Sequence, residues 1–181
     1  LAQPEKPGRA NLVLVNVALP RGLEHAVPEI GTYRKNWVNE VLDAARSLGL
    51  DALVSIHPRD TMPRFDWPVN PEPIERFLPD AAVVVSPPST VIFTALALGV
   101  PVACHQCPPL RQRMPDAFDE PYGAFRVSEN LAELTQSIEE AVAGPSNCRK
   151  KSQEFFTRHI SVIPERTMTE RTVDAIIGLL G

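Results

Sequence analysis

Two groups of polar residues in this chain have side chains suited to binding an anion. His57 and Arg59 directly follow one short β-branched run, and Ser86, Ser89 and Thr90 follow a second. An imidazole, a guanidinium and hydroxyl groups can all donate hydrogen bonds to phosphate oxygens, and the charged donors form the stronger bonds. If the two runs are strands of one sheet, these side chains would converge on one anionic ligand.

The segment around Ser89 has the signals of a strand that passes into a helix. The run Ala81–Val85 is rich in valine and too short for a helix, which is typical of a buried strand. Ser89 and Thr90 then precede an apolar stretch that closes at Gly99, and this order predicts a helix with an N-cap and a C-terminal stop. The first N–H groups of such a helix lie at the positive end of its dipole, so the position suits a phosphate.

Each motif also has a purely structural interpretation. Pro58 removes a backbone donor and holds His57 extended, so the His-Pro-Arg motif can be a turn with a solvated arginine. Ser89 can simply cap its helix, although capping and phosphate binding use the same N–H groups and do not exclude one another. The residues alone therefore leave binding and structural roles open at both motifs.

Three further residues are candidate binding residues because they follow other predicted strands. Arg21 and Gly22 come after the first strand, where glycine lets the backbone approach a ligand closely, and His105 comes after the fourth. Cys104 and Cys107 have the spacing of a zinc-binding pair, but the chain offers no second pair, so we expect no metal. The sequence also lacks the glycine fingerprints of dinucleotide and P-loop sites, and we expect no cofactor.

Apolar runs and amphipathic stretches alternate along the chain. Strands are predicted at 12–18, 52–56, 81–85, 100–104 and 124–127, and helices at 33–48, 72–77, 90–98, 131–142 (capped by Ser128), 146–159 and 165–180. This alternation predicts an α/β fold with a doubly wound, Rossmann-like parallel sheet covered by helices on both faces. In such sheets ligands bind outside the carboxyl ends of the strands, which is where the candidate residues are expected.

Composition limits the partners and the location. The chain has 181 residues, a net charge of −4 and three cysteines. The charge does not favour nucleic acid, and we expect no membrane span, which leaves peripheral membrane association open. Few cysteines indicate a reducing compartment, so a cytoplasmic location is expected. Residues 1–10 are expected to be a linker and residues 11–181 one nucleotide-donor-binding domain, a lobe of a longer protein.

The order of these motifs resembles the C-terminal, donor-binding lobe of glycosyltransferases with two Rossmann-like lobes, the GT-B type. The resemblance is strongest over Val54–Cys104, which contains the His-Pro motif, a Pro-rich loop, the S-x-x-S-T motif and G-x-P-V before a strand. More narrowly, this stretch is similar to bacterial capsule and teichoic-acid enzymes. These include the CDP-glycerol glycerophosphotransferases and the sialyl- and Kdo-transferases with an HP motif.

The resemblance implies that His57 and the Ser89–Thr90 pair bind the phosphate and ribose of a CMP-, CDP- or UDP-linked donor. It also implies bacterial surface polysaccharide synthesis, a catalytic base in a separate N-terminal lobe, and no transfer by this chain alone. Many such enzymes carry an acidic residue four or five positions after the Ser/Thr pair, where this chain has Phe93, Thr94 and Ala95. The absence of this carboxylate, which typically binds a ribose, argues against a UDP-sugar donor. Two alternatives to the transferase lobe stay open: a non-catalytic nucleotide- or protein-binding module, and a lobe like that of UDP-sugar 2-epimerases.

Overall fold

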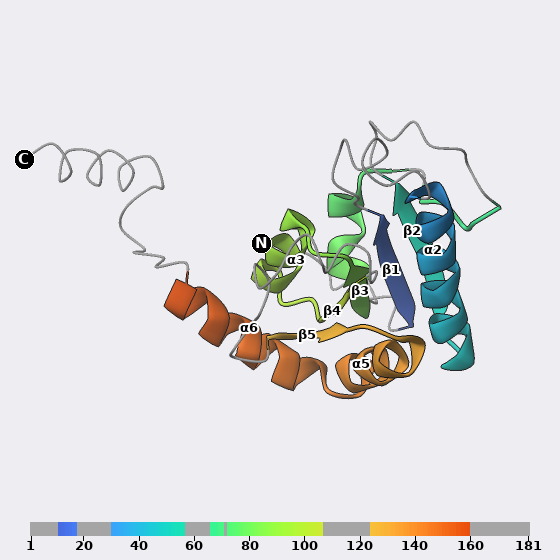
Figure 1. The fold of residues 1–181 in the computed structure, drawn as a ribbon. Coiled ribbons are helices and arrows are strands. Elements are labelled where there is room, and N and C mark those ends of the chain that lie inside the picture. Colours follow the sequence, from blue (N-terminus) through green and yellow to red (C-terminus); the bar gives the residue numbers. More distant parts are fainter. Residues whose placement is uncertain (1–10, 18–29, 57–65, 71, 107–123, 160–181) are drawn as a thin grey trace, which may run out of the picture.

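The computed structural model describes residues 11–17, 30–56, 66–70, 72–106 and 124–159, which form one parallel sheet with helices on both faces (Figure 1). The five strands lie in the order β2-β1-β3-β4-β5, and every neighbouring pair is parallel. The strands are β1 (Leu12–Val17), β2 (Asp51–Ile56), β3 (Val83–Ser86), β4 (Val102–His105) and β5 (Phe125–Ser128). The helices are α2 (Ile30–Ser47), α3 (Thr90–Ala97), α5 (Leu131–Ala143) and α6 (Pro145–His159), with 3₁₀ turns η1 (Ile74–Arg76) and η2 (Leu78–Asp80). The predicted α/β class and parallel sheet are confirmed.

The strand order reverses beside β1. The chain moves from β1 outward to β2 and then returns to place β3 on the other side of β1, so Val15 lies opposite Val54 on one side and Val85 on the other. The carboxyl ends of β1 and β3 therefore form the switch point of the sheet. Doubly wound sheets bind their ligands at such a point, because the connections leave it in opposite directions and open a crevice there.

Alternation along the strands divides the core into two layers. On one face Val13, Val15 and Val17 of β1 belong to a buried cluster with the apolar stripe of α2 and with Leu134 and Ile138 of α5. On the other face Leu14 of β1 belongs to a cluster shared with α3 and α6. Successive strand side chains point to opposite faces, so residue parity decides which layer each strand residue enters. This rule also decides which face the polar residues at the carboxyl edge occupy.

Two elements differ from the sequence-based prediction. The predicted helix at 72–77 is instead the pair of 3₁₀ turns η1 and η2, with Pro73 capping the first turn and Pro79 near the start of the second. Proline cannot donate the N–H bond that a longer α-helix would need there, which favours short turns. The N-cap of α5 is Asn130, whose side chain accepts the Glu133 N–H at 3.0 Å, and Ser128 is the last residue of β5.

The outer edge of β2 is partly covered by a short segment of the Pro-rich connection. The Val54 N–H donates to the Pro68 carbonyl at 2.8 Å, and the Asn70 N–H donates to the Val54 carbonyl at 2.9 Å. The expected linker at 1–10, residues 107–123 and the expected helix at 165–180 lie outside the described residues. Within the described part, no helix combines the length and apolar character that crossing a membrane requires.

Candidate functional site

The switch point carries a cluster of amide and hydroxyl groups. The Asn16 Nδ2 atom donates to Ser86 Oγ at 2.9 Å and lies 3.1 Å from Ser89 Oγ. The two serine hydroxyls are 3.2 Å apart, and Ser86 Oγ donates to the Pro87 carbonyl at 2.7 Å. Asn16 and Ser86 are both buried. This cluster ties the end of β1 to the end of β3 and fixes the turn from which α3 starts.

The start of α3 is suited to an anion. Ser89 caps the helix by accepting the Val91 N–H at 3.3 Å, and the first turn contains no acidic residue. Thr90, the first helical residue, is exposed. A helix start without carboxylates keeps its positive end available for a negatively charged ligand.

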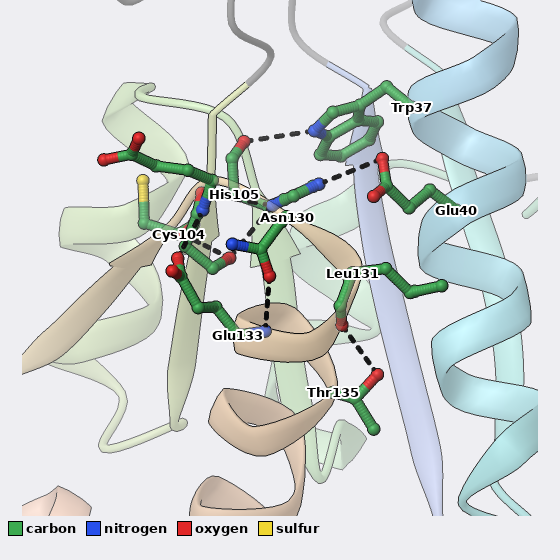
Figure 2. Close-up of polar contacts among 10 residues, drawn as sticks. Trp37, Glu40, Cys104, His105, Asn130, Leu131, Glu133 and Thr135 are labelled. Atoms are coloured by element: carbon green, nitrogen blue, oxygen red, sulfur yellow. Dashed lines mark hydrogen bonds and ion pairs between the residues drawn. The ribbon is translucent and has the colours of Figure 1, made fainter.

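The start of α5 lies at the same edge of the sheet but is already neutralised. Asn130 caps it, and Glu133 in its first turn accepts the Glu129 N–H at 2.9 Å (Figure 2). A carboxylate at this position satisfies a backbone donor and offsets the helix dipole, as an incoming anion would. Of these two helix N-termini, that of α3 is therefore the better candidate for binding a phosphate.

His105 lies at the carboxyl end of β4 but on the opposite face of the sheet from the serine cluster. Its ring is buried, with Nδ1 2.9 Å from Ser128 Oγ and Nε2 3.5 Å from Glu40 Oε2. The Trp37 indole stacks on the ring with 6.0 Å between centroids, and its Nε1–H donates to the His105 carbonyl at 3.1 Å. Figure 2 shows the imidazole between α2 and the turn that leads into α5. Both ring nitrogens are thus occupied by groups of this chain.

A buried cation lies on α2, the helix that begins beyond β1. Arg34 is 3% exposed and belongs to the core-facing stripe that continues through Val38 and Val41. Its guanidinium lies over the Trp67 indole, 5.9 Å from the ring centroid, and Trp67 Nε1–H donates to Asn39 Oδ1 at 3.1 Å. An arginine keeps its charge under all ordinary conditions, so this part of the structure holds a permanent positive charge.

The structure brings together some of the predicted site residues and separates others. Ser86 and Ser89 share one cluster and Thr90 follows directly, whereas the His105 side chain belongs to the other face. His57, Arg59, Arg21 and Gly22 lie outside the described residues, so their part in the site stays a prediction. A ligand contact by His105 also stays a prediction, because its described partners are all within the chain.

Asn16 was missed by the sequence analysis. It lies in the strand LVLVNV, and it is the only polar residue of that strand. A single amide near the carboxyl end of a buried strand is the signal that would have identified it, because a buried amide requires hydrogen-bond partners. Gln106, just after β4, was expected from the sequence to line the pocket together with His105: it is 8% exposed, and its Oε1 atom has no hydrogen-bond partner among the described residues.

Cysteine chemistry does not contribute to the described site. Cys104 points into the core layer shared with α3, and burial raises the pKa of its thiol to about 12. A thiol with so high a pKa stays protonated and is a poor metal ligand and nucleophile. The described residues contain no group of three or more histidine, cysteine or acidic side chains placed to hold a metal ion. Cys107 lies outside them.

Comparisons with known proteins find only distant likeness, among solved structures. No model of a known protein family matches the chain, and no curated protein matches it. Among solved structures, the chain is similar to spinosyn forosaminyltransferase SpnP, with a TM-score of 0.46 and 16% sequence identity. The match covers 78% of this chain and 39% of that structure, so the chain spans well under half of its length. At this level the comparison identifies no substrate and no catalytic residue.

Proposed function

We propose that this chain is the nucleotide-donor-binding lobe of a glycosyl- or glycerophosphotransferase, in which the start of α3 holds the leaving phosphate. The observation that carries the proposal is the Asn16–Ser86–Ser89 cluster at the switch point between β1 and β3. It orders a helix start that has no acidic residue in its first turn. Donors fixed in advance at such a position stabilise negative charge that develops on a leaving group.

The nature of the ligand follows from the sequence motifs. The His-Pro-Arg motif directly follows Ile56, the last residue of β2, and β2 is the other neighbour of β1 in the sheet. The resemblance to enzymes with HP and paired Ser/Thr motifs supports a cytidine- or uridine-linked donor. In this proposal His57 and Arg59 supply charged donors, and Ser89, Thr90 and the backbone N–H groups of α3 supply neutral ones.

The proposal also includes a limit on activity. The described cluster consists of amide and hydroxyl groups, which donate hydrogen bonds but do not accept a proton at neutral pH. A transferase needs a general base to activate the acceptor hydroxyl. We therefore expect this chain alone to bind nucleotide and to transfer nothing, with the base supplied by another lobe.

Calorimetric titration of the chain with CMP, CDP, UDP and GDP tests nucleotide binding and shows which nucleobase the site prefers. The variant Ser89→Ala should weaken the preferred nucleotide about tenfold, and His57→Ala about ten- to a hundredfold, the expected loss for a neutral and a charged hydrogen bond. Ser146→Ala, at an exposed position in the first turn of α6, is the matched control and should bind normally. Absence of binding by all four nucleotides would refute the proposal, as would unchanged affinity in both folded variants.

Turnover provides a separate test. The chain is mixed with CMP-sugar, CDP-glycerol or UDP-sugar donors and several acceptors, and nucleotide release is followed. Release at the rate of the protein-free control is expected. Sustained turnover by this chain alone would show that it contains a complete catalytic site.

A further inference from the structure

We infer that Gln106 makes the site at the start of α3 selective for phosphate esters that carry a free hydroxyl, over phosphate itself. The inference rests on the proposed function and extends it. The helix start holds the phosphate, and the Gln106 carboxamide binds a hydroxyl of the sugar or polyol that is esterified to it. Three observations carry the inference: an acceptor atom without a partner, its place beside α3, and the hydrogen bonds of the polar groups around it.

The first observation is a buried acceptor without a partner. Gln106 is 8% exposed, and its Oε1 atom makes no hydrogen bond within the described part of the chain. Its backbone is held in place, because its N–H donates to the Ser128 carbonyl at 3.0 Å and extends the β4–β5 ladder by one residue. A buried polar atom without a partner lowers the stability of the folded protein. A hydrogen bond from a bound ligand would remove this cost.

The second observation is the face of the sheet on which Gln106 lies. Cys104 belongs to the core layer covered by α3, and successive residues of a strand alternate between the two faces. Gln106 is two residues after Cys104 on the extended ladder, so it lies on the α3 face. By the same rule Asn16 and Ser86 lie on this face, whereas His105 lies on the other. Gln106 therefore shares its face with the serine cluster.

The start of α3 lies over this part of the sheet edge. α3 packs against both β3 and β4, and only three residues separate the end of β3 from Thr90, where the helix begins. Ser86 is paired with Cys104 in the register of these strands. Gln106 therefore extends about 6–7 Å beyond that pair, on a strand about 4.8 Å from β3. Its side chain borders the helix start from the β4 side, and the serine cluster borders it from the β1 and β3 side.

The third observation is that the polar side chains of the serine cluster are engaged with one another. Asn16 Nδ2 lies 2.9 Å from Ser86 Oγ and 3.1 Å from Ser89 Oγ, and the Ser86 hydroxyl donates to the Pro87 carbonyl at 2.7 Å. These bonds use both Nδ2 hydrogens of Asn16 and the hydroxyl hydrogen of Ser86. Neither group has a donor left for Gln106, so the carboxamide is a separate polar group at the helix start.

The chemistry of the carboxamide selects its partner. Oε1 accepts hydrogen bonds, and so do phosphate oxygens, so this atom does not match the phosphate itself. A hydroxyl donates to Oε1 and accepts from Nε2–H, and it fits the amide in either of its two orientations. The hydroxyls nearest to a bound phosphate belong to the groups esterified to it. In a nucleotide-linked donor these are the ribose and the transferred sugar or polyol.

Calorimetric titration with matched ligands tests the inference and distinguishes the two sources of the hydroxyl. CDP, 2′,3′-dideoxy-CDP and CDP-glycerol share the base and the diphosphate; UDP, 2′,3′-dideoxy-UDP and UDP-glucose replace them if uridine binds better. If the ribose supplies the hydroxyl, the wild type should bind CDP about five- to tenfold more tightly than its dideoxy form. If the transferred group supplies it, CDP-glycerol should bind more tightly than CDP by a similar factor.

The variant Gln106→Met should lose this preference. Methionine is similar to glutamine in length and has neither the amide donor nor the amide acceptor. The affinity ratio should fall to less than about twofold, since one neutral hydrogen bond accounts for it. Gln136→Met makes the same chemical change at an exposed position on α5 and is the matched control, which should keep the wild-type ratio.

The stability of the ligand-free protein is a readout that a structural role would move. Because Oε1 has no partner in the described structure, Gln106→Met should leave the unfolding equilibrium constant unchanged or lower it. A hydrogen bond that supported the fold would instead make this constant rise by about tenfold on substitution. Such a rise would overturn the inference.

The titration separates failure of this inference from failure of the proposed function. If the wild type binds none of the nucleotides, the proposed function fails and this inference fails with it. If the wild type binds them but shows neither preference, or if Gln106→Met keeps the preference, only the inference is overturned. Gln106→Leu replaces Gln106→Met if the latter does not fold. Failure of both variants to fold would show that the carboxamide is a structural group, which also overturns the inference.

Discussion

At the scale of single residues, neighbouring positions on one strand have opposite environments. Cys104 enters the core layer with α3 and α6, and His105, one residue later, enters the polar cluster with α2 and β5. The alternation of a β-strand is the cause, because each successive side chain points to the other face. Chemical behaviour follows from the face: the thiol is inert, and the imidazole lies between polar groups, with Nδ1 hydrogen-bonded to Ser128 and Nε2 facing the Glu40 carboxylate.

The buried thiol gives a prediction for alkaline pH. Burial raises the pKa of Cys104 from its ordinary value of 9.0 to about 12. Between these values the folded protein keeps a proton that the unfolded chain releases, so the stability contributed by the neutral thiol is lost as pH rises through this window. Urea unfolding at pH 8 and at pH 10.5 measures this loss. Between these two pH values the free energy of unfolding should fall by about 1–2 kcal/mol more in the wild type than in Cys104→Ala. Equal slopes for the two proteins would contradict this.

At the scale of elements, the ends of helices and strands are defined by particular side chains. Two residues between β5 and α5 have different roles. Ser128 links β5 to β4 through hydrogen bonds of its side chain with His105 and the Cys104 carbonyl, and Asn130 caps α5. Both are small polar residues, and either could cap a helix by type. Ladder pairing of Ser128 with His105 is what assigns the cap to the other residue.

Replacing the α5 cap should destabilise the protein. Asn130→Ala removes the acceptor for the Glu133 N–H and should lower the free energy of unfolding by about 0.5–2 kcal/mol. Asn36→Ala, at an exposed interior position of α2, is the control; it should be neutral or stabilising, since alanine has the higher helix propensity. Thermal or urea unfolding measures both. If Ser128 rather than Asn130 capped α5, Asn130→Ala would leave the free energy of unfolding unchanged.

Two glycines that end helices provide a second prediction at this scale. Gly49 and Gly99 have φ angles of 68° and 69°, which most other residues adopt only with strain. A Cβ on Gly49 would meet nothing within 4 Å, whereas one on Gly99 would lie 3.2 Å from Arg149 Cγ. Gly49→Ala should therefore cost about 1–2 kcal/mol from backbone strain alone. Gly99→Ala should lower the free energy of unfolding by more, because its new Cβ must also displace the Arg149 side chain. Equal losses for the two variants would show that the Arg149 side chain moves freely.

At the scale of the whole molecule, one sheet separates two core layers that depend on each other. The layer with α2 and α5 contains Ile138, and the layer with α3 and α6 contains Ile92, both fully buried. Neither layer can form without the sheet, because each layer packs against one of the two faces of the sheet. The described part of the chain should therefore unfold as one cooperative unit.

Paired core substitutions test that cooperativity. Ile92→Ala and Ile138→Ala should each cost about 2–5 kcal/mol, from lost burial and the cavity left behind. Because the sheet lies between the two sites, the double variant should show the sum of the single losses to within about 0.5 kcal/mol. Its denaturant slope should match that of the wild type. A second transition, or a reduced slope, would indicate that the two layers unfold separately.

The sequence by itself determined the fold class and the order of the elements. Valine-rich runs, Ser89 before an apolar stretch, and Gly49 and Gly99 at helix ends predict strands and helices to within a few residues, because these signals act locally. They also predicted Ser86 and Ser89 at the end of a strand. The single-site signals at Ser128 and at the Pro-containing segment of η1 and η2 were misassigned, since more than one local structure fits them.

Only the tertiary structure decided which polar residues share a site. The order β2-β1-β3 places the end of β1 beside Ser86, so Asn16 joins a serine 70 positions away in the sequence. The parity of β4 turns His105 to the other face, where Glu40 and Ser128 occupy its two nitrogens. These outcomes depend on strand order, register and face together. No local pattern encodes them, because they arise from long-range pairing that burial of both core layers selects.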